Sequence, residues 1–449
     1  MSLFPRATDR ADQIYQIIES LFPFNYGITG NGIISSISAY LTYLDFQIDY
    51  FESGLTLNGW TIPRGWSCAR ATIESESISY DCIASSPLGC AYLSPSFSGM
   101  VSYEELLQHC SCRTDLPNAI VYDWTRLYRQ KAISRWGLSI PYERIAEFPR
   151  EDFKVTIECQ TYDSHMPVLS YTLLGGTSDT IYLNAHNCHP FQANDDISGV
   201  ATLIYLFQQL SLVKKRRYSY TLLLGPELFA PMFWLQKYPP SESASSYCLL
   251  LKSIGNSEPL QLQSSYTADS VIDRAAFVAF RDHIPQFAHP HPYRSYYGND
   301  ETVFESPGYR IPTISLTRFP FVNYHTHLDT PSSISKSSLG QTYDTLLSII
   351  EVLETSRKAQ AVKPGLFCLS SPKYNLYKRA PAPGIDEHGN TDREKQWNLL
   401  MNCLPMDLDD KLSALDVAIK YNLPYAEVSS YLRRWEDLGI VTFEHSSDQ

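Results

Sequence analysis

Apolar residues recur at helical spacing near the start of the chain. Within residues 10–22 they fall on one face of a 3.6-residue period, and a second helical pattern follows at 33–44 after a glycine-containing turn. The apolar positions of the first pattern are Ile14, Ile17, Ile18 and Leu21. The chain therefore begins with two expected amphipathic helices.

From residue 152 to about residue 356, short apolar runs alternate with helical patterns. Alternation of this kind predicts a three-layer αβα domain, with a central mixed, largely parallel sheet and helices on both faces. Ligands of such folds bind beyond the carboxyl ends of the strands. The expected strands are Phe153–Cys159, Val168–Leu174, Thr180–Ala185, Tyr218–Leu224, Tyr247–Leu251 and Thr313–Leu316, and the helices are Val200–Leu212 and Thr342–Glu354.

Three further parts are expected around this domain, which comprises residues 1–50 and 137–360. Residues 51–136 hold short alternating stretches between Gly, Pro and Ser clusters and predict a small β-rich insert. Residues 361–390 form a connector rich in Pro, Ser, Lys and Gly. Residues 391–449 predict a winged helix-turn-helix, with helices at Arg393–Cys403, Ala414–Tyr421 and Tyr425–Leu438.

The charge balance argues against nucleic acid as a partner. The chain has 449 residues and a net charge of −12, and an acidic surface repels phosphate backbones. The expected recognition helix carries two arginines and three carboxylates, whereas a helix that reads DNA should be clearly basic. These residues are Arg433, Arg434, Glu427, Glu436 and Asp437. We expect a structural or partner-docking module, with a DNA-binding regulator that senses a ligand as the alternative.

The sequence shows no sign of a membrane or secreted protein. No apolar run reaches the roughly 18–20 residues that span a bilayer, and the N-terminus lacks a long apolar core. Ten cysteines are too sparse for a disulfide scaffold, and the Cys110-x-Cys112 pair has no second close pair to complete a zinc site. We therefore expect reduced thiols and a cytoplasmic protein.

The stretch from His186 to Gly199 lies between an expected strand and an expected helix. His189 offers a nitrogen ligand and Asp195 offers oxygen ligands, a combination that suits zinc or another divalent ion. The alternative is that Asp195 or Asp196 caps the helix and His189 lies in a turn.

Three further loops carry candidate residues. Glu227 directly follows a strand and could be a ligand or a general base, or only a solvated carboxylate. His325 and His327 could each bind a metal, with Asp329 in support, or be hydrogen-bonded loop histidines. The adjacent carboxylates Asp300 and Glu301 could line a substrate pocket, although an acidic pair in a loop is usually solvated.

These segments together resemble the zinc aminopeptidase superfamily. More closely, the chain resembles a bacterial group of aminopeptidase-like proteins whose main domain is called DUF4910, with a β-rich DUF2172 insert and a C-terminal winged helix. The segments that carry the resemblance are Ile28-Thr-Gly-Asn-Gly, Trp60-Thr-Ile-Pro, Cys188-His-Pro, Ala193-Asn-Asp-Asp-Ile-Ser-Gly, Gly225-Pro-Glu, Asn299-Asp-Glu, Ser306-Pro-Gly and Tyr324-His-Thr.

The resemblance implies a role for each matching residue. His189 matches the first metal histidine, and Asp195 matches the carboxylate that bridges two metals. Glu227 matches a carboxylate ligand, and His325 matches the last metal histidine. Asp300 and Glu301 match the acidic loop that lines the substrate pocket.

Three departures make a two-metal site look incomplete. Relatives have paired glutamates where this chain has Pro226 before Glu227, and an orienting aspartate where it has Phe191. A further acidic ligand is expected where this chain has Lys252.

The simplest site that is consistent with these departures holds one zinc per chain, and a two-zinc site is the alternative. Asp195, Glu227 and His325 would hold the ion, as the Asp-Glu-His set of the related glutaminyl cyclases implies. His189 would be a fourth ligand or a pocket hydrogen-bond donor, Glu301 would be the base, and the ammonium of Lys252 would offset carboxylate charge.

The expected function is hydrolysis of an amide bond in a small or peptide-like substrate by metal-activated water. Asp300, Glu301 and His327 are the expected substrate-binding residues. The alternatives are acyl transfer or cyclisation at a single zinc, ligand binding without catalysis, and the ligand-sensing regulator. The insert is a candidate lid or a contact between copies in a homo-oligomer.

Overall fold

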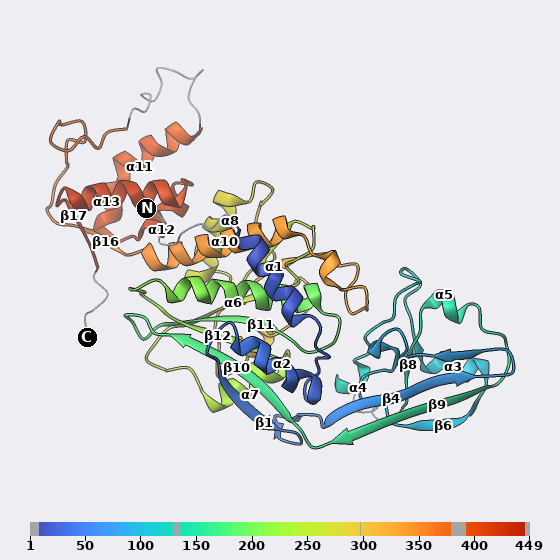
Figure 1. Ribbon diagram of the computed structural model, residues 1–449. Helices are drawn as coiled ribbons and strands as arrows, with labels where there is room; N and C mark the ends of the chain where they lie inside the picture. Colours follow the sequence, from blue (N-terminus) through green and yellow to red (C-terminus); the bar gives the residue numbers. More distant parts are fainter. Residues whose placement is uncertain (1–8, 129–134, 297, 379–391, 445–449) are drawn as a thin grey trace.

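Three parts of the molecule lie roughly in a line (Figure 1). A computed structural model describes residues 9–128, 135–296, 298–378 and 392–444. The C-terminal helices lie at one end, the α/β domain in the middle, and a smaller β-sheet lobe at the other end. None of the helices in the described ranges combines the length and apolarity needed to cross a membrane.

The α/β domain contains a seven-stranded sheet in the order β1-β10-β12-β11-β13-β15-β14. The four middle strands, β12, β11, β13 and β15, are parallel, whereas β1, β10 and β14 run antiparallel to their neighbours. This confirms the expected mixed sheet, which is parallel in its four middle strands. The strands are β1 Gln47–Glu52, β10 His165–Leu173, β11 Thr180–His186, β12 Ser219–Gly225, β13 Ser246–Lys252, β14 Leu260–Gln263 and β15 Thr313–Arg318.

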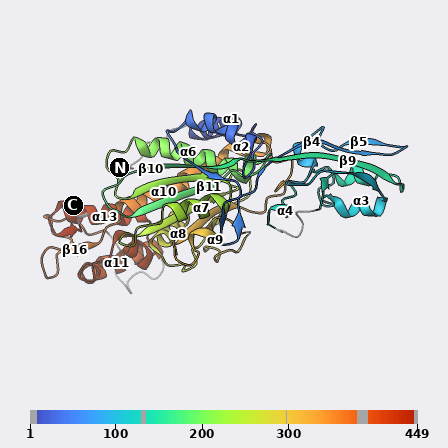
Figure 2. The same cartoon turned by 90° about the horizontal axis from the view of Figure 1, so that it is seen from below.

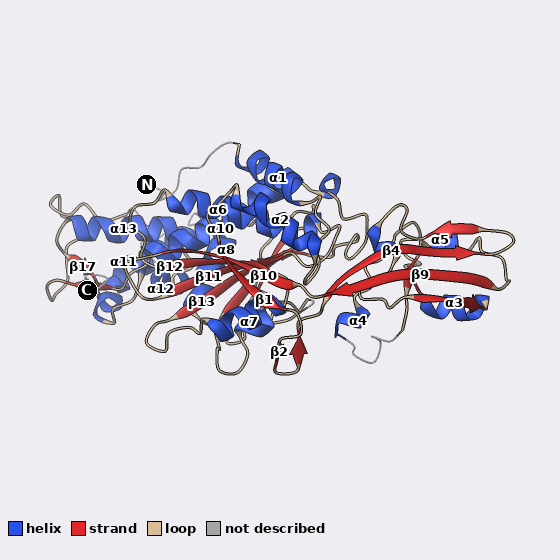
Figure 3. Ribbon diagram, turned by 60° about the horizontal axis from the view of Figure 1, so that its bottom comes forward, coloured by secondary structure: helices blue, strands red, loops and turns tan. Residues whose placement is uncertain are grey.

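Side chains alternate between the two faces of this sheet and divide the apolar core in two. On β11, Ile181 and Leu183 join one cluster, while Tyr182 between them joins the other. The first cluster is covered by α1 Arg10–Leu21, α2 Asn31–Leu41, α6 Ser198–Ser211, α8 Val271–His283 and α10 Lys336–Thr355. The second is covered by α7 Phe229–Lys237 and α9 Glu301–Phe304. Figure 3 shows α1, α2 and α6 on one side of the sheet and α7 on the other, which confirms the three-layer arrangement.

The smaller lobe is built on a four-stranded antiparallel sheet in the order β5-β4-β9-β6, and it extends away from the α/β domain (Figure 2). Its strands are β4 Gly65–Glu74, β5 Ser79–Asp81, β6 Phe97–Val101 and β9 Phe153–Tyr162. The segment Phe153–Cys159, expected in the central sheet, lies here instead. The alternating pattern of β9 explains this position. Its residues are buried and exposed in turn, as expected of an antiparallel strand that is covered on one face only.

Short elements lie beside the sheet of the smaller lobe or, for β2 and β3, against the α/β domain, where the ring of Trp60 contacts that of Phe229 in α7. A two-stranded ribbon, β2 with β3, and a parallel pair, β7 with β8, lie along the chain between β1 and β9. The elements are β2 Thr56–Leu57, β3 Trp60–Thr61, α3 Tyr103–His109, β7 Cys110–Ser111, α4 Thr125–Tyr128, β8 Leu138–Ser139 and α5 Tyr142–Ile145.

The C-terminal part packs on α8 through an apolar helix face. Its elements are α11 Asp392–Asp409, α12 Ala414–Lys420, α13 Tyr425–Asp437 and β17 Val441–Phe443, which pairs with β16 Ala359–Ala361. Val428, Leu432 and Trp435 of α13 are buried in the cluster that also contains α8 and α10. Arg281 of α8 donates to the carbonyl of Leu423 at 2.6 Å, which ties the turn before α13 to the α/β domain.

Candidate metal centre

The candidate residues follow the parallel strands, at the edge where their carboxyl ends meet. Four non-glycine residues in these loops adopt the left-handed backbone region that side chains disfavour. They are Phe191 (φ 53°), Leu228 (φ 57°), Ser253 (φ 51°) and His325 (φ 54°). Such conformations recur at functional sites, and these four lie in the loops after β11, β12, β13 and β15.

His189, Asp195 and His325 converge at this edge. Their ligand atoms all lie within 4.8 Å of one another. Oδ2 of Asp195 is 3.5 Å from Nε2 of His189 and 3.5 Å from Nε2 of His325. The structure thus brings together three of the four expected metal ligands, from segments that lie far apart in the sequence.

The spacing and the unpaired atoms of this group suit a zinc ion. Nε2 of His189 and Oδ2 of Asp195 are buried and have no hydrogen-bond partner among the residues that the structure describes. At 3.5 Å they are too far apart for a good hydrogen bond. Zinc bonds of about 2.0–2.1 Å at tetrahedral angles place neighbouring ligand atoms about 3.4 Å apart. The group therefore fits a shared divalent cation with a fourth position open.

His189 is oriented by its own neighbour and by the smaller lobe. Its Nδ1–H donates to the carbonyl of Pro190 at 2.9 Å, which leaves Nε2 free to bind a metal. Its ring stacks on Tyr122 with centroids 4.6 Å apart and planes inclined by 23°. These contacts fix the orientation of the His189 ring, while Phe191 stands where the resemblance implied an orienting aspartate.

His325 is held by backbone pairing with the smaller lobe. The N–H of Tyr122 donates to the carbonyl of His325 at 2.8 Å, and the N–H of His327 donates to the carbonyl of Ile120 at 3.0 Å. The ring stacks on Tyr324 with centroids 3.8 Å apart. Burial, with His189 adding to it, lowers the pKa of His325 to about 3, so its imidazole is neutral as a metal ligand must be.

Asp195 is fixed by a second carboxylate. Asp329 accepts the backbone N–H groups of Asn194 at 2.7 Å and Asp195 at 3.0 Å. The hydroxyl of Ser253 donates to Oδ1 of Asp195 at 3.2 Å, which leaves Oδ2 for the two histidines. Asp329 thus supports Asp195, whereas the sequence had suggested that it would support His325 or His327.

His186, the last residue of β11, lies among three carboxylates. Its Nε2 is 3.4 Å from Oδ1 of Asp195 and 3.7 Å from Oε2 of Glu227, and its Nδ1 is 3.6 Å from Oδ2 of Asp196. Burial opposes protonation, but Glu227, Asp195 and Asp196 raise the pKa of His186 to about 10. Sequence reasoning missed His186, although it directly follows the expected strand Thr180–Ala185.

Glu227 lies outside the three-ligand group, on the other side of His186. Its Oε2 accepts a hydrogen bond from Nδ2 of Asn299, and its side chain is 19% exposed. Burial raises the pKa of Glu227 to about 7, with Asp195 and Asp300 adding to the effect and His186 opposing it. A carboxylate with this pKa can accept and release a proton near neutral pH.

Asp300 and Glu301 are fully buried behind Glu227. Asp300 accepts the N–H of Leu228 at 2.6 Å. Glu301 accepts the N–H of Asn299 at 3.0 Å and faces Nζ of Lys252 at 3.4 Å, with both side chains fully buried. The structure thus holds Glu301 in a fully buried ion pair with Lys252.

A cavity of about 340 Å³ opens beside Glu227 and His325. Its wall is largely aromatic, with contributions from Tyr122, Trp124, Tyr128 and Tyr324. Asp300, Glu301 and His327, the expected substrate-binding residues, are not part of this wall. His327 is instead bound to the smaller lobe, since its Nδ1 accepts the N–H of Ile120 at 3.0 Å.

A model of the family described as "Domain of unknown function (DUF4910)" matches residues 15–356. This range includes the expected insert. The chain is also 26% identical over 449 residues to a protein of Clostridium acetobutylicum, covering 97% of this chain and 98% of the relative. That protein is named "Putative polysaccharide biosynthesis protein with aminopeptidase-like domain".

Solved structures share the fold. A crystal structure of a "putative peptidase" from Clostridium acetobutylicum matches with a TM-score of 0.80 and 22% identity, covering 97% of this chain and 98% of that one. A zinc aminopeptidase from Bacillus subtilis matches with a TM-score of 0.53 and 14% identity, covering 77% of this chain and 95% of that one. These similarities show an aminopeptidase-like fold.

Proposed function

Since this chain belongs to the DUF4910 family of domains of unknown function, its activity must be inferred from its site, and we propose that it is a zinc-dependent hydrolase of the aminopeptidase or deacylase type. The observation that carries the proposal is the convergence of His189, Asp195 and His325 on one point, with buried atoms left unpaired. An unpaired buried carboxylate oxygen such as Oδ2 of Asp195 is costly, and a bound cation removes that cost.

The charges around the three ligands favour a single zinc at this centre. A second ion would be expected on the side of Asp195 that faces Glu227. There the imidazole of His186 lies between the two carboxylates, and Lys252 faces Glu301 nearby. These nitrogen groups supply positive charge where a second cation would otherwise be needed.

In the proposed reaction, the zinc ion and Glu227 have separate roles. Zinc, when bound, acidifies a water molecule and polarises the carbonyl of a substrate. Glu227 takes the proton of the attacking water and returns it to the leaving amine, and Asn299 orients the carboxylate for both transfers. This assignment replaces Glu301 as base, because Glu301 is fully buried against Lys252.

The aromatic cavity favours a small or peptide-like amide with an apolar face. Trp124, Tyr128 and Tyr324 offer flat rings on which an aromatic side chain or the apolar face of a sugar can stack. The relative named for polysaccharide biosynthesis makes N-acylated amino sugars a second class to test beside aminoacyl amides.

The test compares Glu227→Gln with the wild type, both loaded with zinc, on a panel of aminoacyl amides and N-acetylated amino sugars. Release of free amine is the measurement. We expect the wild type to hydrolyse amides with apolar groups, and Glu227→Gln to retain zinc while losing at least about 100-fold in kcat, as loss of a general base does.

Glu301→Gln is the matched control, because the proposal gives the carboxylate of Glu301 no role in the reaction. It should retain most of the activity if it folds. Zinc-loaded wild type that cleaves none of these amides would favour the alternative of a ligand-binding protein. Hydrolysis that survives in Glu227→Gln would refute the role of Glu227.

A further inference from the structure

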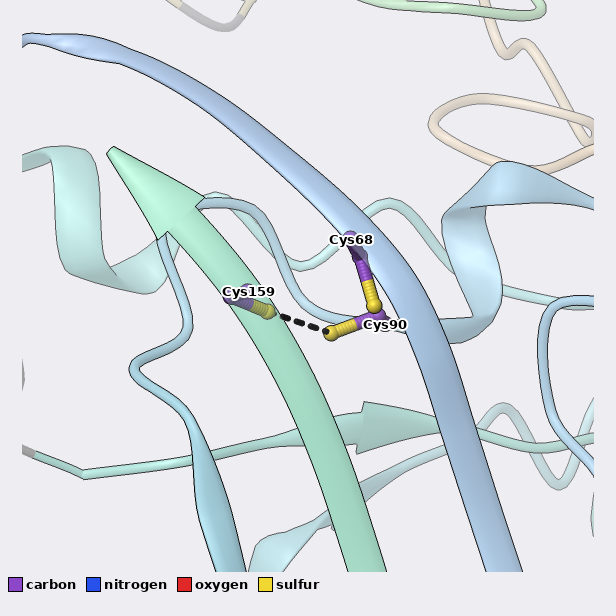
Figure 4. A group of neighbouring side chains, drawn as sticks. All are labelled: Cys68, Cys90 and Cys159. Atoms are coloured by element: carbon purple, nitrogen blue, oxygen red, sulfur yellow. Dashed lines mark hydrogen bonds between the residues drawn. The ribbon is translucent and has the colours of Figure 1, made fainter. Parts of the chain in front are cut away.

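A second group of metal-binding side chains lies in the smaller lobe, apart from the metal centre. Cys68 of β4, Cys159 of β9 and Cys90, which follows the 3₁₀ turn Pro87–Gly89, place their sulfur atoms within 4.8 Å of one another. The sulfurs of Cys90 and Cys159 are 3.9 Å apart, and Figure 4 shows the three side chains pointing toward one another.

The backbone fixes all three cysteines in place. Cys68 and Cys159 lie directly opposite each other in the β4–β9 ladder, whose register shifts just after Cys68. Cys90 is buried, and its backbone forms a β-bridge with Leu138. Because two strands and a loop each contribute one sulfur, the group is set by the tertiary fold.

The spacing of the sulfurs matches that of thiolates on a shared ion. Zinc–sulfur bonds of about 2.3 Å at tetrahedral angles separate neighbouring sulfurs by about 3.8 Å. A disulfide would need one pair to close to about 2.05 Å and would leave the third thiol unused. Simple packing of small apolar thiols accounts for buried Cys90 but less well for the half-buried Cys68 and Cys159.

A cavity gives this group access to solvent and space for a further ligand. Cys68 and Cys90 line a cavity of about 310 Å³, far more than the roughly 30 Å³ that one water molecule occupies. Tyr122 and Pro190, which both contact His189, line the same cavity. A metal held by the sulfurs would therefore have a fourth position open to water.

We propose that Cys68, Cys90 and Cys159 bind one Zn²⁺ as thiolates, with the fourth position open to this cavity. Binding releases a proton from each thiol that is protonated beforehand. Thiolates select zinc over the hard cations magnesium and calcium.

A zinc ion bound at this site would stabilise the smaller lobe where it meets the α/β domain. Near the cysteines, Tyr162 at the end of β9 accepts the N–H of Asn31 at the start of α2. Zinc would join β4, β9 and the loop of Cys90 at this end of the sheet. The same lobe contributes Tyr122 to the metal centre, so the bound ion would help to keep the lobe in position.

The test is titration of the reduced, metal-stripped full chain with Co²⁺ under anaerobic conditions. Thiolates bound to Co²⁺ give a charge-transfer band in the near ultraviolet that His and Asp ligands do not give. We expect this band in the wild type, its loss in Cys68→Ser and Cys159→Ser, and its retention in His325→Ala, which alters only the metal centre. Cys112→Ser, at an exposed cysteine, is the matched control.

A second measurement distinguishes the loss of a metal ligand from the misfolding of a variant. In His325→Ala, added Zn²⁺ should raise the Tm, and this rise should disappear when Cys68→Ser is also present. Absence of the charge-transfer band in folded wild type, or a band that persists in both Cys68→Ser and Cys159→Ser, would overturn the proposal. So would a wild type that forms the Cys90–Cys159 disulfide and binds no Co²⁺ when reduced.

Discussion

The ring of Tyr122 stacks on the imidazole of His189, with centroids 4.6 Å apart. Tyr122 belongs to the segment between β7 and β8, whereas His189 follows β11 of the α/β domain. The N–H of Tyr122 also donates to the carbonyl of His325. One residue of the smaller lobe therefore contacts two of the three candidate ligands, which makes the lobe part of the metal centre.

Replacing Tyr122 should weaken metal binding through the loss of its ring. Contacts that orient a metal-ligating histidine typically contribute 10- to 100-fold in affinity. We expect Tyr122→Ala to raise the Kd for zinc about 10-fold, measured by competition with a chelator in a Cys68→Ser background that removes the cysteine site. Tyr122→Phe keeps the ring and should bind like the wild type; equal affinity of the Ala and Phe variants would contradict the prediction.

Asp329 should matter for metal binding although it is not a ligand. Its carboxylate accepts the N–H groups of Asn194 and Asp195 and thereby fixes the loop that presents Oδ2 of Asp195. In Asp329→Ala these buried N–H groups lose their acceptor, and we expect zinc affinity to fall about 10- to 100-fold. Asp163→Ala, at an exposed aspartate, is the control and should leave the Kd unchanged.

Much of this centre could be predicted because strand ends are visible in the sequence. His189, Asp195 and Glu227 follow apolar runs, and parallel strands bring their carboxyl ends to one edge. That reasoning placed these residues near one another. It could not separate ligand from base, because it gives no side-chain positions. In the structure, Oε2 of Glu227 lies 3.7 Å from Nε2 of His186 and outside the three-ligand group.

Other features depend on contacts between distant segments and had no local signal. The pairing of Ile120–Tyr122 with the loop of His325 joins parts about 200 residues apart. The approach of Cys90 to Cys68 and Cys159 follows from the fold of the smaller lobe, where nothing in the spacing of the cysteines indicates it. Likewise, Glu301 is a pocket candidate by sequence but lies buried against Lys252.

Asp300 should make the stability of the metal-free protein depend on pH. Burial raises its pKa to about 6, with His186 opposing the shift, from about 3.9 in an unfolded chain. Because the unfolded chain releases this proton first, Asp300 reduces stability progressively from about pH 4 to about pH 6, and fully above that range.

The variant Asp300→Asn removes this titration and keeps an acceptor for the N–H of Leu228. In the presence of chelator we expect it to be more stable than the wild type at pH 7.5, by up to about 3 kcal/mol. The difference should disappear near pH 3.5, as measured by denaturant unfolding. A variant less stable than the wild type at pH 7.5 would show that the charged carboxylate is stabilised in the fold.

Glu354 should contribute to global stability without affecting the metal centre. At the end of α10 its carboxylate accepts the N–H groups of Arg217 and Tyr218 and the hydroxyl of Tyr220, at 2.7, 3.2 and 2.7 Å. Glu354→Ala leaves these donors at the start of β12 unpaired, and we expect a loss of about 2–4 kcal/mol in the free energy of unfolding.

The control for Glu354 is Glu351→Ala on the same helix, whose carboxylate has no such contacts among the hydrogen bonds of the described residues. Urea denaturation of both variants measures the difference. A loss in Glu351→Ala as large as in Glu354→Ala would attribute the effect to the helix itself and not to the carboxylate contacts.

The central claim is that His189, Asp195 and His325 hold one ion, and its most direct test is the zinc content of purified protein. In a Cys68→Ser background, where only the metal centre remains, we predict one zinc per chain. Adding His325→Ala should reduce the content to near zero while the circular dichroism spectrum stays unchanged. A zinc content that is unaffected by His325→Ala would contradict the account.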